Sequence, residues 1–74
     1  MEPAVAIPFV IKCTFPGKIQ LWAAATNTVD EAIALVQGQV GTNAQVEYTG
    51  TILLRTHVTQ IALLDGRCLV LAET

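Results

Sequence analysis

Residues 9–41 contain two alternating runs, a two-residue turn and a capped helix, and this block constrains the fold more than any other part of the chain. Apolar residues recur at every second position in 9–15 and again in 18–23, which predicts two half-buried strands. Pro16-Gly17 between them is a turn pair, so the two runs predict a β-hairpin. The side chains expected to face inward are Phe9, Ile11, Cys13, Phe15, Ile19, Leu21 and Ala23.

A helix is predicted to follow the hairpin, over about residues 29–39. Thr28 and Glu31 have the spacing of a capping box, in which the hydroxyl accepts the amide hydrogen of the third helical residue. Asp30 adds negative charge to the first turn, where the helix dipole favours it, and Gly41 is expected to cap the end. One apolar stripe runs along this helix and predicts that it packs across one face of a sheet: Val29, Ala32, Ile33, Val36 and Val40.

The second half of the chain predicts shorter elements. A strand is expected over 45–49, a turn at Gly50-Thr51, and another short strand over 52–55. Residues 56–64 fit both a helical turn and an extended run. Asp65-Gly66 is a turn signal before a last strand over 67–72. The expected order is β-β-α-β-β-β in one α+β domain of residues 1–74, with 1–6 as an N-terminal lead.

This order and spacing resemble the ubiquitin-like β-grasp family. The resemblance is carried by the hairpin over 9–21, the helix from Thr28 to Gly41, the strand and turn over 46–53, and the closing Leu69-Val70-Leu71. It covers about residues 7–72 and implies a mixed sheet of four to five strands with one helix across one face. It also implies that the last strand lies beside the first and parallel to it.

The family's conjugation chemistry does not carry over to these residues. Covalent modifiers and sulfur carriers of the family end in Gly-Gly, whereas this sequence ends in Ala72-Glu73-Thr74. Only Lys12 and Lys18 could accept a lysine-linked chain. The hydrophobic patch of ubiquitin is also replaced, because the residues near its positions are Thr14, Glu47 and Ala72 or Val70. We therefore expect a non-conjugated domain.

Composition and charge exclude several classes of function. The four basic residues are scattered and the net charge is -2, so we expect no nucleic-acid binding. No apolar run is long enough to span a bilayer, and the start has no basic region of a secretory signal, so we expect no membrane partner and a soluble, cytoplasmic protein. His57 stands alone and Cys13 and Cys68 form no CxxC motif, so we expect no metal site, no cofactor and no catalytic residues.

Trp22 is expected to face outward on the second strand, and tryptophan is enriched in binding hot spots. The first hypothesis is therefore a protein-interaction module that binds another protein through the outer sheet face or by strand addition at an exposed edge. The residues expected to surround Trp22 on that face are Val10, Lys12, Thr14, Gln20, Glu47 and Val70.

Three alternatives remain open. One is an artificial or computationally designed ubiquitin-fold scaffold without a natural function, because the local sequence signals agree at nearly every element. Another is a modifier or sulfur carrier whose Gly-Gly tail lies beyond this sequence. A third is an enzyme subunit that contributes surface but no catalytic group. Sparse surface charge predicts a monomer or weak self-association.

Overall fold

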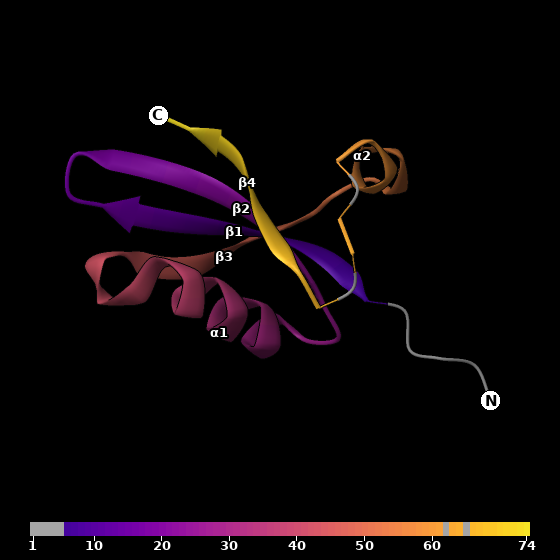
Figure 1. Ribbon diagram of the computed structural model, residues 1–74, viewed down its shortest axis with the longest axis horizontal. Coiled ribbons are helices and arrows are strands. Elements are labelled where there is room, and N and C mark those ends of the chain that lie inside the picture. Colours follow the sequence, from indigo (N-terminus) through magenta and orange to yellow (C-terminus); the bar gives the residue numbers. More distant parts are fainter. Residues whose placement is uncertain (1–5, 62, 65) are drawn as a thin grey trace.

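The computed structural model describes residues 6–61, 63–64 and 66–74. Within these residues, four strands and two α-helices follow the order ββαβαβ, with a short 3₁₀ helix, η1, before the third strand (Figure 1). Their bounds are β1 (Ile7–Phe15), β2 (Lys18–Thr26), α1 (Val29–Val40), η1 (Gly41–Asn43), β3 (Gln45–Ile52), α2 (Arg55–Gln60) and β4 (Cys68–Glu73). Residues 1–5 of the expected N-terminal lead, and Asp65 of the expected turn, lie outside the described residues.

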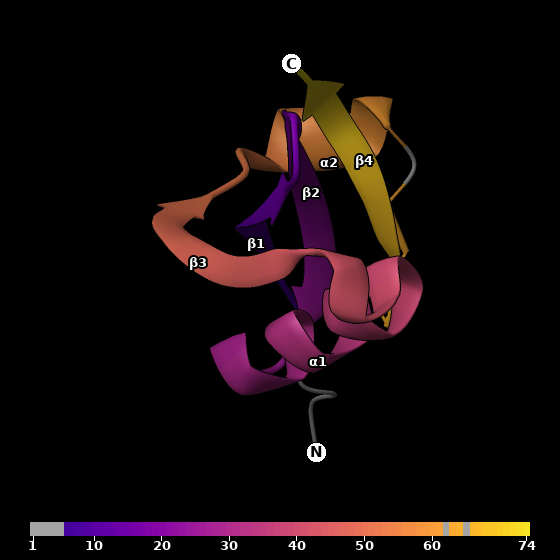
Figure 2. The same ribbon diagram turned by 90° about the vertical axis from the view of Figure 1, so that its left-hand side faces the viewer.

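The four strands form one antiparallel sheet in the order β3-β1-β2-β4. Figure 2 shows this sheet from the left-hand side of Figure 1. This order contradicts the β-grasp fold and the mixed sheet that the sequence analysis predicts. A strand has only two edges, and β1 pairs with β2 on one side and with β3 on the other. The last strand therefore cannot pair with β1. It pairs instead with the outer edge of β2, antiparallel, with Leu69 opposite Ala23.

The hairpin is confirmed, but the predicted inward face of its second strand is wrong. Pro16 and Gly17 form the turn, with Gly17 at a φ of +85°, and Phe15 pairs with Lys18. A two-residue turn sets odd residues of β1 opposite even residues of β2. Trp22 therefore pairs with Ile11 and shares its face, whereas Ile19, Leu21 and Ala23 point to the other side.

Helix α1 is confirmed together with its caps. The Glu31 amide donates to Thr28 Oγ1 at 3.2 Å, as the capping-box spacing predicts. The second half of the box differs, because the Thr28 hydroxyl donates to Glu31 Oε1 at 3.1 Å and the carboxylate accepts there. Gly41 has a φ of +70°, and its amide donates to the Gln37 carbonyl, so a residue without Cβ ends the helix.

The apolar stripe of α1 covers one face of the sheet and forms the larger core there (Figure 1). Ile11, Cys13 and Val36 are fully buried in it. The rings of Phe9 and Tyr48 meet edge to face, with centroids 5.4 Å apart, a geometry that aromatic pairs prefer. Partly buried side chains of α1 and of all four strands pack against this core: Phe15, Trp22, Val29, Ile33, Leu35, Val40, Val46 and Cys68.

A smaller core lies on the opposite face, where α2 and the segment after it cover one end of the sheet. Ala23, Ala25 and Leu63 are buried in it. Val58 and Ile61 pack there, as a helical turn over 56–64 predicts, but Leu64 is 65% exposed. Residues 55–60 therefore form a helix that covers one end of the second face of the sheet.

Strand β3 continues through the predicted turn at Gly50-Thr51, so both that turn and the predicted strand over 52–55 are wrong. Ile11 pairs with Tyr48 and Phe9 with Ile52, which leaves two extra residues on β3. Gly50 adopts a φ of +84° in this irregular stretch. The glycine signal in the sequence therefore marks a bulge in a longer strand.

Candidate functional site

The seven residues expected to form one binding patch lie on two different faces of the sheet. Gln20, Trp22 and Val70 share the face that packs on α1, because Trp22 pairs with both Ile11 and Val70. The opposite face carries the other four: Val10, Lys12, Thr14 and Glu47. The structure therefore does not bring the predicted patch together, and the binding role of these residues stays a prediction.

Trp22 is half-buried against the α1 core and does not face outward. Its Nε1–H donates to Gln20 Oε1 at 3.0 Å, and the Gln20 amide nitrogen donates to Glu73 Oε2. Its polar group is thus satisfied inside the protein. Counting positions across the two-residue turn would have placed Trp22 on this face from the sequence alone.

Glu73 links β4 to β2 through a second partner on the same face. The Lys18 ammonium lies 3.5 Å from Glu73 Oε2 and 4.9 Å from the centre of the Phe15 ring. The hydrogen bond from Gln20, and then the charge of Lys18, lower the pKa of the Glu73 carboxyl. These groups satisfy one another, which indicates a structural tie between the two strands.

On the opposite face, the predicted binding residues include a weak ion pair and a buried valine. Lys12 Nζ lies 3.8 Å from Glu47 Oε1, and both side chains are largely exposed, so the pair is weak. Val10 is only 7% exposed, and its carbonyl accepts the Thr49 hydroxyl at 2.9 Å. Val10 is therefore largely buried in the protein interior.

The residues with reactive side chains are also dispersed. Cys13 pairs with Gln20 and Cys68 with Ala24, so four positions along β2 separate the two free thiols. Burial raises the pKa of each thiol, which keeps it in its less nucleophilic form. His57 lies exposed on α2.

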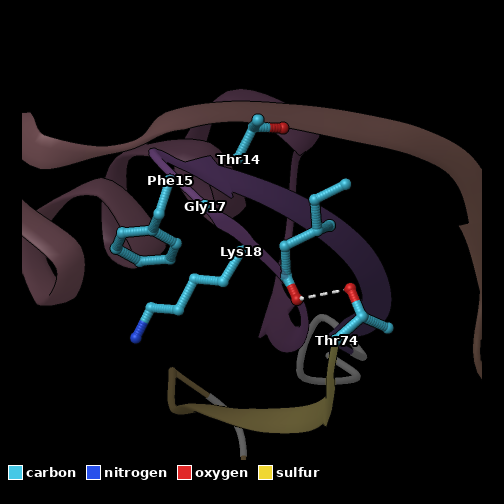
Figure 3. Close-up of a pocket in the computed structure, with 6 residues that line it drawn as sticks. Thr14, Phe15, Gly17, Lys18 and Thr74 are labelled. Carbon is cyan, nitrogen blue, oxygen red and sulfur yellow. Dashed lines mark hydrogen bonds between the residues drawn. The ribbon is translucent and has the colours of Figure 1, made fainter.

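A shallow hollow of about 370 Å³ lies at the tip of the hairpin (Figure 3). The Thr74 hydroxyl donates to the Ile19 carbonyl at 3.3 Å and closes one side. Lys18 is the charged group in the lining, and Phe15 and Glu73 already engage it. The hollow is lined by Thr14, Phe15, Gly17, Lys18, Ile19 and Thr74.

The outer edge of β4 carries backbone groups that β2 does not use. Ile19 and Thr74 exchange two backbone hydrogen bonds, and the Ala25 amide donates to the Arg67 carbonyl. Antiparallel pairs alternate between bonded and non-bonded positions, so the amides and carbonyls of Cys68 and Val70 point away from β2. In the described part of the chain no strand lies on that side. The sequence could not predict this edge, because it placed the last strand in the sheet centre.

A second hollow of about 440 Å³ lies beside the start of β4, toward the first half of α1. Figures 1 and 2 both show the start of β4 near this helix. Gly66 contributes no side chain, and the space where its Cβ would lie is open. The lining residues are Thr26, Glu31, Ala34, Leu35 and Gly66. A free strand edge and a hollow walled by a helix are therefore adjacent.

Within the described ranges, no helix is long and apolar enough to cross a membrane. The same residues contain no group of three or more His, Cys, Asp and Glu side chains that could hold a metal ion. No protein-family model, no curated protein and no solved structure matches the chain.

Proposed function

We propose that this protein binds an extended segment of another protein, which adds to the sheet as a fifth strand beside β4. The observation that carries the proposal is the free edge of β4, where the amides and carbonyls of Cys68 and Val70 point outward. An added strand gains affinity from main-chain hydrogen bonds and specificity from its alternate side chains. The proposal requires no cofactor, nucleic acid or catalytic residue, and the cytoplasmic location expected from the sequence remains a separate part of it.

The composition of β4 supports this edge over the edge of β3. Residues 68–72 contain neither charge nor proline, the devices that protect an edge strand from pairing. Val70 is 44% exposed. The register shift in β4 lies after Val70, so Cys68 to Val70 remains regular. Strand β3 has the Glu47 charge and the bulge at Gly50, and both oppose strand addition.

The proposal is tested with a displayed library of eight- to ten-residue peptides and a proline substitution at the edge. Val70→Pro removes an outward amide without removing a bond to β2, so it blocks the edge selectively. We expect peptides selected by the wild-type chain to bind Val70→Pro about tenfold more weakly in fluorescence anisotropy, because main-chain bonds are lost.

Ile52→Pro is the matched control. The Leu53 amide donates to the Pro8 carbonyl at 2.9 Å, so the neighbouring Ile52 amide also points outward, on the other edge of the sheet. This variant should keep wild-type peptide affinity. Equal weakening in both variants, with unchanged unfolding midpoints, contradicts the proposal. If no library peptide binds the wild-type chain, the alternative of a scaffold without a partner is favoured.

A further inference from the structure

The hollow of about 440 Å³ beside β4 indicates which peptides the β4 edge would accept. This inference rests on the proposed strand addition. A residue added opposite Cys68 or Val70 has its side chain on the same face as theirs, the face of α1. The hollow lies on that side, at the Cys68 end of the strand. One side chain of the added strand is therefore directed toward it.

The hollow is apolar on its helix wall and acidic at its rim. Leu35 is half-buried against the main core and Ala34 is exposed, so together they offer apolar surface. An aliphatic side chain of the added strand would cover this surface and lose contact with water, which is favourable. Gly66 adds no side chain to the lining, and the space where its Cβ would lie is open.

The charge at the rim comes from Glu31. Its side chain is exposed, and its Oε1 accepts the neutral Thr28 hydroxyl at 3.1 Å. Asp30 precedes it, and α1 contains no basic residue. Glu73, the acidic residue of β4 on the same face, is already engaged by Lys18 and Gln20. Among the described residues that line the hollow, Glu31 is therefore the charged one.

We propose that the β4 edge selects an extended peptide with an aliphatic residue for the hollow and a lysine or arginine two positions away, beside Glu31. Residues two positions apart in a strand share a face, about 7 Å apart, so both side chains reach the α1 side together. The occupant is thus a basic, aliphatic strand of another protein.

The test compares three peptides that differ at one position, with lysine, glutamine or glutamate two residues from a leucine. Each is made with the variable residue before or after the leucine, since the direction of the added strand is open. We expect the lysine peptide to bind about two- to fivefold more tightly than the glutamine peptide at low salt, the range for an exposed ion pair. Raising the salt concentration should reduce that preference.

Glu31→Gln is the decisive variant, because glutamine at this position is compatible with the helix cap. It should abolish the preference for lysine and leave the affinity of the glutamine peptide unchanged. Asp30→Asn removes the same charge one residue away, outside the hollow lining, and should retain most of the preference. These outcomes assign the selectivity to one carboxylate and exclude a general effect of net charge.

The outcomes separate this inference from the proposed function. If all three peptides bind the edge equally, or if the preference survives in Glu31→Gln, the charge selectivity is overturned while strand addition stands. If none of the peptides binds, strand addition fails as well. If the apparent Kd rises with protein concentration, a second copy of this chain occupies the edge, and the peptide assignment is overturned.

Discussion

The role of the Trp22 side chain depends on the sheet face on which it lies. On an exposed sheet face it would be a candidate binding anchor. Here it packs against the α1 core, opposite Ile11 and Val70, and donates to Gln20. Its position follows from the two-residue turn, since Phe15 and Lys18 must pair across it.

Trp22→Ala is therefore predicted to destabilise the protein. Truncation of a large aromatic side chain in a core costs about 3–5 kcal/mol, and a half-buried position falls near the lower end. Chemical denaturation should show a loss of about 3 kcal/mol in the free energy of unfolding. Trp22→Phe, which keeps most of the packing, should lose less. An unchanged unfolding free energy in Trp22→Ala would mean that the side chain faces solvent.

At the scale of elements, local patterns predict where elements occur but not how they pair. The hairpin, α1 and β4 were predicted within a few residues, because period, capping and turn chemistry act over short distances. The partner of β4 depends on which edges remain free after β3 has paired with β1, and no local pattern contains that information. The free edge and its hollow follow from this pairing, so neither could be predicted from local sequence patterns.

The tie between β2 and β4 gives a prediction for pH. The hydrogen bond from Gln20, and then the charge of Lys18, lower the pKa of the Glu73 carboxyl below its ordinary value. A carboxyl with a lower pKa in the folded state stabilises the fold when it is charged. Its contribution is complete above about pH 4.5 and is lost as the pH falls through the lower, folded-state pKa.

Urea unfolding at several pH values measures this contribution. Glu73→Gln should destabilise the protein slightly at neutral pH, and the difference from the wild-type chain should vanish at the acidic end. Both side chains of the Lys18–Glu73 pair are about half-exposed, so the effect is small and should weaken in high salt. A difference between the two chains that does not change with pH would contradict the role given to this carboxylate.

At the scale of the whole molecule, the strand order decides what the protein can bind. In a β-grasp sheet the last strand lies beside the first, in the sheet centre. Here β4 is an edge, with α1 on one face and α2 over part of the other (Figures 1 and 2). Both faces are partly covered by the chain itself, and the edge of β4 is the regular strand segment left for a partner.

Amide hydrogen exchange by NMR, on the wild-type chain with and without a selected peptide, tests this account most directly. Strand addition bonds the outward groups of β4, so the Cys68 and Val70 amides should exchange rapidly in the free protein and become protected on binding. The Ile52 amide, on the other edge, should be unaffected. Binding that leaves the Cys68 and Val70 amides unprotected, or that protects Ile52 instead, would contradict the account.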